Sequence, residues 1–285
     1  MKPRSLWRRR EIRPVGGNEP AALFALSEQW RPGPLPRGLP PPSVAQGSGG
    51  RTMKYEDVPG WFMPIDQAAF TWLLQFQNRT QPVGGLVELG VFKGKSAVLI
   101  GNHLRPGEVF TCCDLFDDIA TSEFADPGEQ RFFRGQSLTQ AEFERNYLTF
   151  HRDLPRIVRG PTGQITRHVA PGSARFVHID AGHTYALVRE DTASAKAMLR
   201  EGGVVVFDDY RKANTMGTAA AVWEAVLNDG LRPIANTDFK LYATWGDPAP
   251  YQADIDARAR EAGWCRTAEA VHIRDMPMIY LARKG

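Results

Sequence analysis

The sequence predicts an α/β protein with a doubly wound, Rossmann-like and mainly parallel β-sheet, and three observations support this fold class. Short apolar segments rich in β-forming residues alternate with segments whose apolar residues recur at helical spacing. The segment 176–210 contains a strand, a helix and a strand joined by short links, which is typical of a right-handed βαβ unit. The second strand of this unit, 203–207, is apolar throughout, as expected when helices cover both faces of a parallel sheet.

Residues 1–52 differ in composition from the rest and are expected to form a basic, Pro/Gly-rich extension and linker. Three arginines stand at residues 8–10, prolines are frequent in residues 31–42, and residues 47–50 read GSGG. Such composition is typical of flexible segments, although an arm or lid that reaches a neighbouring subunit is the alternative. The folded domain is expected to span residues 53–285.

Helices and strands are expected to alternate along this domain. Helices are predicted where apolar residues recur every three or four positions, at 65–78, 96–104, 139–150, 165–169, 187–199, 217–227 and 252–262. Strands are predicted at 86–89, 109–113, 157–160, 176–179, 203–207, 240–245 and 278–282. A regular alternation of this kind favours a parallel sheet with helices on both faces.

Composition and charge exclude several classes of protein. Hydrophobic residues make up 42% and charged residues 24% of the 285-residue chain, which is ordinary for a globular domain. Residues 1–51 hold nine Lys/Arg against three Asp/Glu, which leaves 26 against 29 in the rest, so no nucleic-acid groove is expected across the domain. No run approaches 18 consecutive apolar residues, so we expect neither a membrane span nor a signal peptide. Three cysteines cannot form a disulfide framework and suit a reducing cytoplasm.

Acidic residues follow both strands of the βαβ unit. Asp180 comes directly after the first strand, and Asp208 and Asp209 follow the second. Neighbouring parallel strands end at the same edge of a sheet, so these carboxylates are expected to converge there, with His183 on the loop above. Clustered carboxylates repel one another unless a cation lies between them, and Mg²⁺ prefers oxygen ligands. The sequence therefore predicts a magnesium site, while the alternative is that Asp208 and Asp209 only form a turn.

A glycine-containing loop joins the first predicted strand to the next helix. The segment VELGVFKGKS places Gly90 where a tight turn is needed and Gly94 where the backbone can approach a ligand. Asp114 ends the following strand, 24 residues after Gly90, the position from which a carboxylate reaches a ribose diol. The N-terminal amides of the helix that opens at Lys95 and Ser96 favour a carboxylate, so the loop is expected to bind a nucleoside with an amino-acid tail.

A phosphate-binding P-loop is the main rival interpretation of this loop. That motif requires four residues between its first glycine and the Gly-Lys pair, whereas three separate Gly90 from Gly94. The Glu88 carboxylate would also direct negative charge toward the phosphates. An NTPase is therefore the less favoured alternative.

Together these segments resemble a known enzyme family. ELGVFKGKS, Asp114, HIDAGH and GGVVVFDDY resemble the class I S-adenosylmethionine-dependent methyltransferases, and more narrowly the metal-dependent actinobacterial sugar O-methyltransferases of macrolide-sugar and mannose type, over about residues 58–245. The resemblance implies a seven-stranded sheet with its last strand antiparallel, magnesium on the three aspartates Asp180, Asp208 and Asp209, and a homodimer or larger homo-oligomer. The residues expected to bind S-adenosylmethionine are Glu88, Gly90, Phe92, Gly94, Lys95, Ser96, Asp114 and Asp180.

The expected function is magnesium-dependent O-methyl transfer from S-adenosylmethionine to a hydroxyl of a sugar or glycoside in the cytoplasm. His183 is the candidate general base, because a histidine has an ordinary pKa of about 6.5. A structural histidine bonded to the backbone is its alternative role. The alternatives for the protein as a whole are a catechol-type or other natural-product O-methyltransferase and a cofactor-binding module without catalysis.

Overall fold

The computed structural model describes residues 53–117, 130–131, 136, 138–273 and 276–284. The extension predicted over residues 1–52 lies outside these residues. None of the described helices is long and apolar enough to cross a membrane.

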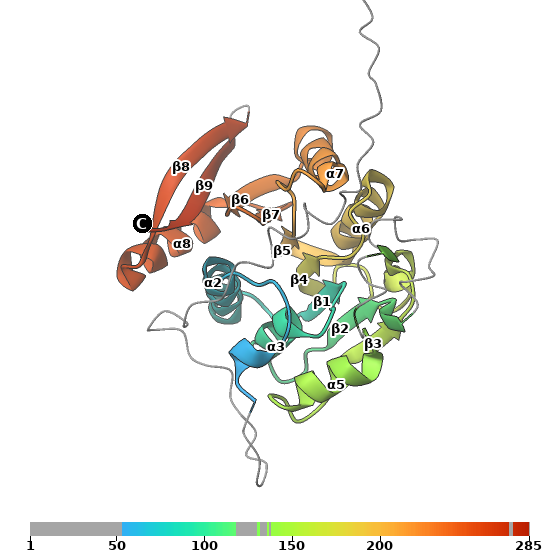
Figure 1. Cartoon of the computed structure of the whole chain (residues 1–285). Helices are drawn as coiled ribbons and strands as arrows, with labels where there is room; N and C mark the ends of the chain where they lie inside the picture. Colours follow the sequence, from blue (N-terminus) through green and yellow to red (C-terminus); the bar gives the residue numbers. More distant parts are fainter. Residues whose placement is uncertain (1–52, 118–129, 132–135, 137, 274–275, 285) are drawn as a thin grey trace, which may run out of the picture. The chain divides into compact units, whose positions relative to one another are not determined.

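The described residues form one nine-stranded sheet with the order β3-β2-β1-β4-β5-β7-β6-β9-β8 (Figure 1). Strands β3, β2, β1, β4 and β5 are mutually parallel, β7 is antiparallel to both β5 and β6, β9 is parallel to β6, and β8 is antiparallel to β9. The strands are β1 (Gly85–Leu89), β2 (Phe110–Asp114), β3 (Arg156–Arg159), β4 (Ala174–Ile179), β5 (Leu199–Phe207), β6 (Arg232–Asn236), β7 (Leu241–Thr244), β8 (Cys265–Ile273) and β9 (Met276–Arg283).

The mainly parallel α/β fold is confirmed, but the expectation of seven strands is wrong. The sequence analysis did not predict two of the strands, β6 and β8. β6 contains Pro233, which is uncommon inside a strand, and its pairing with β7 is irregular between Pro233 and Ala235. β8 mixes charged, polar and apolar residues, and it pairs with β9 as a hairpin that extends the sheet beyond β6. β6 and β8 therefore account for the two strands in excess of the seven expected.

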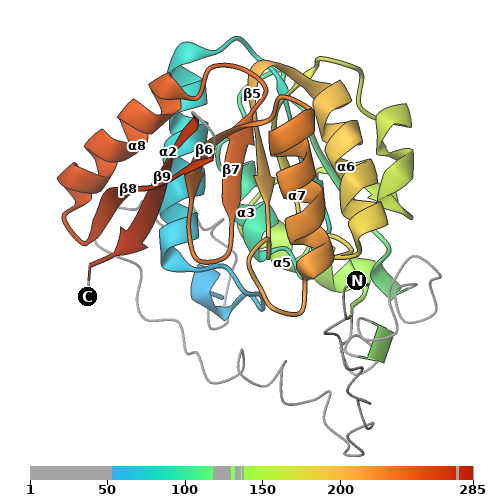
Figure 2. The ribbon, with the colours of Figure 1, turned by 90° about the horizontal axis from the view of Figure 1, so that it is seen from above.

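Helices cover both faces of the sheet (Figure 2). One apolar cluster joins the sheet to α2, α3, α5 and α8, and a second joins its other face to α6, α7 and η3. The helices are α2 (Pro64–Thr80), α3 (Lys95–Gly101), α5 (Gln140–Leu148), α6 (Tyr185–Met198), α7 (Met216–Asn228) and α8 (Ala249–Ala262), with 3₁₀ turns η1 (Tyr55–Asp57) and η3 (Thr162–Arg167). The short helix predicted at 165–169 is the 3₁₀ turn η3.

Strand β4 lies between β1 and β5, and all six of its residues are buried. Its side chains alternate between the two apolar clusters: Phe176 belongs to one, and Val177 and Ile179 belong to the other. β4, α6 and β5 form the βαβ unit that the sequence predicts, with β4 and β5 as parallel neighbours. The unit brings the ends of β4 and β5 to one edge of the sheet, where the candidate site lies.

Candidate functional site

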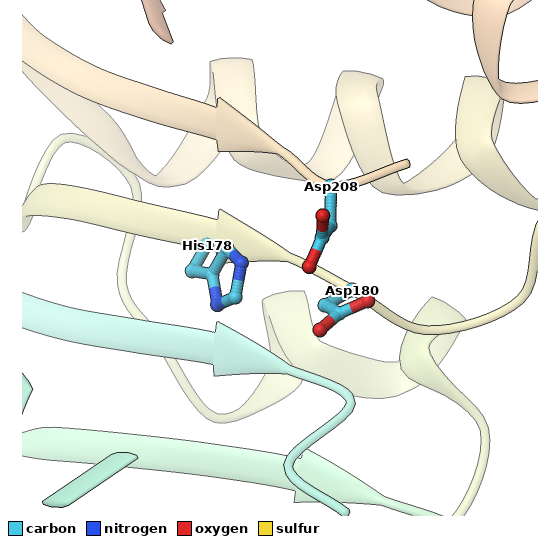
Figure 3. Close-up of side chains that lie close together, drawn as sticks. All are labelled: His178, Asp180 and Asp208. Carbon is cyan, nitrogen blue, oxygen red and sulfur yellow. The ribbon is translucent and has the colours of Figure 1, made fainter. Parts of the chain in front are cut away.

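Acidic side chains meet where β4 and β5 end. Ile179 and Phe207 are paired at the last position of the two strands, and the Asp208 N–H donates to the Ile179 carbonyl at 3.0 Å. Asp180 and Asp208 therefore extend from adjacent strand ends, and their side chains point toward one another with His178 beside them (Figure 3). His178, Asp180 and Asp208 each offer one potential ligand atom, and these atoms lie within 4.8 Å of one another.

His178 is a member of this cluster that the sequence analysis did not include among the candidate site residues. It lies opposite Glu88 in the pairing of β4 with β1, and its Nδ1 is 2.8 Å from Glu88 Oε1. Both side chains are fully buried. The available signal was the spacing: His178 and Asp180 are two residues apart, so in a strand they extend to the same face.

Lys240 is a second residue that the sequence did not indicate. It precedes β7, and its buried ammonium group contacts the Asp208 carboxylate. Burial alone would raise the pKa of Asp208, but the charges of Lys240 and His178 and the hydrogen bonds with Lys240 and Asp180 together outweigh burial and lower it. Burial alone would likewise lower the pKa of Lys240, and the charges of Asp208 and Asp180 raise it instead. The two groups therefore form a buried ion pair.

The pKa of Asp180 shifts in the opposite direction to that of Asp208. Burial raises its pKa well above the ordinary value, the neighbouring Asp208 charge raises it further, and the attraction of Lys240 only partly opposes these effects. Negative charge at Asp180 is therefore incompletely balanced. A bound cation would remove this imbalance.

Asp209 stands apart from the cluster of His178, Asp180 and Asp208. Its backbone is left-handed, with φ of 55°, and its carboxylate pairs with Lys212 Nζ at 2.7 Å. Burial and Asp208 raise its pKa, while Lys212 and His183 lower it. The structure thus brings two of the three predicted metal ligands together and places the third beside Lys212 and His183.

His183 lies on the loop between β4 and α6, as the sequence predicts for this segment. Its Nε2 is 3.6 Å from Asp209 Oδ2, and its side chain is 25% exposed. Thr184 caps α6 by accepting a hydrogen bond from the Leu187 N–H. Gly217 in α7 packs against this loop so closely that a Cβ atom there would lie 2.5 Å from the His183 carbonyl oxygen. The imidazole is therefore partly exposed but has a buried Nε2, lies beside the Asp209 carboxylate, and is held on a tightly packed loop.

The glycine loop between β1 and α3 borders the acidic residues. Gly90 has φ of 81°, and a Cβ atom there would lie 2.1 Å from the Asp180 carbonyl oxygen. Gly94 caps α3 with φ of 94°. The Asp180 N–H also donates to the Leu89 carbonyl at 2.8 Å. Only glycine at position 90 permits this close approach of the loop to Asp180.

Asp114 ends β2 and fixes the same loop. Its Oδ2 accepts hydrogen bonds from the N–H groups of Val91 and Phe92 at 2.6 and 3.1 Å, and its Oδ1 accepts one from Phe116 at 2.7 Å. Burial raises its pKa, although these backbone hydrogen bonds oppose the effect. A carboxylate can accept about four hydrogen bonds, so Asp114 retains capacity for a ligand hydroxyl.

The remaining predicted donor-binding residues divide into two groups. Phe92, with φ of 49°, packs its ring against Trp61 at 5.3 Å between centroids, and Ser96 lies in the first turn of α3. Lys95 extends instead toward η1, where its Nζ donates to the Glu56 carbonyl at 3.4 Å and lies over the Tyr55 ring. Burial lowers its pKa. The structure therefore places the Lys95 side chain against η1.

The residues fit the two groups that the motifs imply. For a methyl-donor nucleoside, the observations are the left-handed loop, the Asp114 carboxylate and Glu88 Oε2, which is buried and has no hydrogen-bond partner among the described residues. For a divalent cation, the fit lies in the chemistry of the donor set: Asp180 and Asp208 supply hard oxygen ligands, His178 supplies a nitrogen, and Asp180 lacks full charge balance.

The chain is similar to one family model and to several solved structures. Residues 87–210 match the family model described as a methyltransferase domain. Among solved structures, the O-methyltransferase NovP is 18% identical, with 65% of this chain and 81% of that chain covered and a TM-score of 0.53. CalS11, a TDP-rhamnose 3'-O-methyltransferase, is 19% identical over 64% and 79% of the two chains, with a TM-score of 0.42. An O-methyltransferase from Bacillus cereus is 13% identical over 66% and 84%, with a TM-score of 0.44. No curated protein matches the chain.

Proposed function

We propose that this chain, which carries a methyltransferase domain over residues 87–210, transfers a methyl group from S-adenosylmethionine to a hydroxyl of a sugar or glycoside with the help of a divalent cation. One observation carries the proposal. The acidic cluster of Asp180 and Asp208 directly adjoins the glycine loop at Gly90, so a nucleoside on the loop and a cation on the acids would be neighbours. The sugar or glycoside acceptor follows from the resemblance of the motifs.

The donor would be held by the loop and its surrounding acids. Gly90 and Gly94 allow the backbone to approach it, and Asp114 would accept hydrogen bonds from the ribose hydroxyls. When bound, S-adenosylmethionine supplies an electrophilic methyl group on a positively charged sulfur. Glu88, whose second oxygen has no hydrogen-bond partner among the described residues, lies at the end of β1 below the loop.

The acceptor would be oriented and deprotonated at the acidic edge. Asp180 and Asp208, joined by Asp209 once its carboxylate leaves Lys212, would hold the divalent cation, and His178 offers a further nitrogen. When bound, such a cation lowers the pKa of coordinated hydroxyls. His183 Nε2 would accept the proton of the attacking hydroxyl. The Asp209 carboxylate, at 3.6 Å, would stabilise the imidazolium that results.

Calorimetric titration tests the class of cofactor. S-adenosylmethionine should bind, and ATP should not, because the loop lacks P-loop spacing and adjoins carboxylates. Binding of ATP but not of S-adenosylmethionine would refute the proposal in favour of an NTPase.

An acceptor screen tests the reaction. Purified protein with labelled S-adenosylmethionine should methylate members of a panel of sugars and glycosides, and a chelator should suppress turnover until Mg²⁺ is restored. Catechols belong in the same panel because they also present adjacent oxygens. Turnover of catechols alone would keep the methyltransferase and replace the acceptor class.

Replacement of the base tests the role of His183. His183→Ala should abolish turnover while the affinity for S-adenosylmethionine persists. His168→Ala, at an exposed histidine after η3, is the matched control and should keep full turnover. Unchanged turnover in His183→Ala would refute the assignment of the base.

Light scattering of the purified protein tests the proposed homodimer or larger homo-oligomer.

A further inference from the structure

Lys240 is a buried cation within the acidic site. Its side chain is 2% exposed, and its Nζ lies 5.5 Å from the Phe62 ring centroid and 5.9 Å from that of Phe70. Its backbone N–H donates to Thr237 Oγ1 at 3.0 Å, which anchors the turn between β6 and β7. Aromatic packing and the turn therefore hold the ammonium group where it is.

The ammonium group lies among ionisable side chains from three other elements. It contacts the Asp208 carboxylate after β5 and lies 3.5 Å from His178 Nε2 on β4. The charges of Asp180 and of Asp66 on α2 also act on it, and Asp66 Oδ1 accepts hydrogen bonds from Thr237 and Tyr242 at 2.7 Å each. Lys240 thus occupies the centre of a buried group of acids and balances part of their charge.

The two lysines of the site differ in their freedom to leave. Lys212 follows Asp209 by three residues, and its side chain is 34% exposed, so it can move into solvent when Asp209 takes another partner. Lys240 is enclosed by Phe62 and Phe70 and cannot leave Asp208 without displacement of the β6–β7 turn. Lys240 is therefore a permanent positive charge next to the proposed cation ligands.

We infer that Lys240 is a built-in counter-cation that holds Asp208 in position when no divalent ion is bound and that weakens the binding of such an ion. The inference rests on the proposed divalent site. A fixed positive charge repels a divalent cation a few ångströms away, and the repulsion is strong because the surroundings exclude water. The same charge replaces the ion as the partner of a buried carboxylate, so the metal-free protein keeps the geometry of the Asp208 side chain.

Direct measurement of Mn²⁺ binding tests this role without reference to turnover. Lys240→Met removes the charge and keeps an apolar stem, and it should bind Mn²⁺ at least about tenfold more tightly than the wild type. Lys240→Arg keeps the charge and should stay within about threefold of the wild type. The metal-free Lys240→Met protein should melt at a lower temperature, and saturating Mn²⁺ should raise its melting temperature more than that of the wild type. A purely structural lysine would not produce tighter binding.

Three controls separate the possible failures. If Asp180→Asn abolishes Mn²⁺ binding but Lys240→Met leaves the affinity unchanged or weaker, the inference is wrong and the divalent site stands. If no variant binds Mn²⁺ at millimolar concentration, both the inference and the metal-dependent part of the proposed function are wrong. If Lys240→Met does not fold, the charge-balanced Asp208→Asn/Lys240→Met protein replaces it. That double variant should still bind Mn²⁺ more tightly than Asp208→Asn alone, and equal affinities would overturn the inference.

Discussion

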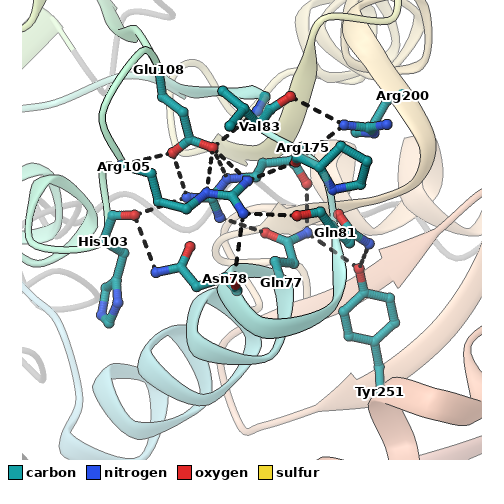
Figure 4. Close-up of polar contacts among 12 residues, drawn as sticks. Gln77, Asn78, Gln81, Val83, His103, Arg105, Glu108, Arg175, Arg200 and Tyr251 are labelled. Carbon is teal, nitrogen blue, oxygen red and sulfur yellow. Dashed lines mark hydrogen bonds and ion pairs between the residues drawn. The ribbon is translucent and has the colours of Figure 1, made fainter.

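The two ends of strand β4 carry opposite arrangements of charge. Near its beginning, the fully buried Arg175 donates to both carboxylate oxygens of Glu108 at 2.8 Å, and to the His103 carbonyl and Gln77 Oε1 (Figure 4). Directly after its end, Asp180 lies beside other acids. A single buried strand thus joins a hydrogen-bonded ion-pair network to an incompletely balanced acidic cluster.

The pKa shifts express the same difference. Burial would raise the pKa of Glu108, but hydrogen bonds from Arg175 and Arg105 lower it to about 2. At the other end, burial and Asp208 raise the pKa of Asp180 despite Lys240. The first region contributes to the stability of the fold, whereas the second retains electrostatic strain that a ligand would relieve. Unbalanced buried charge of this kind is typical of functional sites.

The largest expected effect is on the network at the beginning of β4. Arg175→Met should lower the free energy of unfolding by about 4 kcal/mol, because it leaves polar partners buried without their donor. Denaturant unfolding measures the loss. Arg200→Met is the matched control, since among the described residues Arg200 donates to the exposed carbonyls of Pro82 and Val83, and it should cost about 1 kcal/mol at most. Equal losses in the two variants would show that the network has no special role.

The next effect concerns the proposed catalytic loop. Gly217→Ala should lower turnover about 100-fold with little loss of donor affinity, because its Cβ would displace the backbone at His183 and Tyr185. Steady-state kinetics and calorimetry measure the two quantities. Ala220→Ser, at an exposed position of the same helix, should leave turnover unchanged. Full activity in Gly217→Ala would show that the loop tolerates displacement.

A buried acid in α6, away from both ends of β4, gives a pH-dependent effect. Burial raises the pKa of Asp191 to about 7. The folded state therefore binds this proton more tightly than the unfolded chain, and the stabilisation is present in full below about pH 4 and is lost as the pH rises through 7. Asp191→Asn should be about 2 kcal/mol more stable than the wild type at pH 8, and the gain should diminish toward pH 5. The charge of Glu190 is a minor cause of the raised pKa, so Glu190→Gln should give a smaller gain. A gain independent of pH, or one as large in Glu190→Gln as in Asp191→Asn, would contradict this origin.

The smallest effect is a gain of stability at the acidic end. Asp180→Asn should stabilise the metal-free protein by about 1 kcal/mol at pH 8, because it removes a carboxyl group whose pKa is raised in the folded state. The same variant should abolish turnover. Thermal unfolding in the presence of a chelator measures the gain. If Asp180→Asn is less stable than the wild type, Asp180 stabilises the fold as Glu108 does, and the two ends of β4 do not differ in this respect.

The sequence predicted the parts of this molecule that depend on local pattern. Apolar runs and helical spacing located β4, α6 and β5, and right-handed connection placed Asp180 next to Asp208. It did not predict Lys240, because that lysine enters from the β6–β7 turn and nothing local marks its partner, which lies 32 residues earlier. His178 was missed for a related reason: its partner Glu88 lies on another strand, 90 residues away. Contacts distant along the chain require the fold itself.

The close approach of Gly90 to Asp180 has a consequence for the affinities of the two ligands. The glycine loop and the acidic edge share one wall, since the Gly90 Cα has no room for a side chain against the Asp180 carbonyl. A ligand that shifts this wall changes the affinity of the neighbouring site, and thermodynamic reciprocity makes the two changes equal. If a bound cation changes the affinity for the nucleoside by some factor, the bound nucleoside changes the affinity for the cation by the same factor.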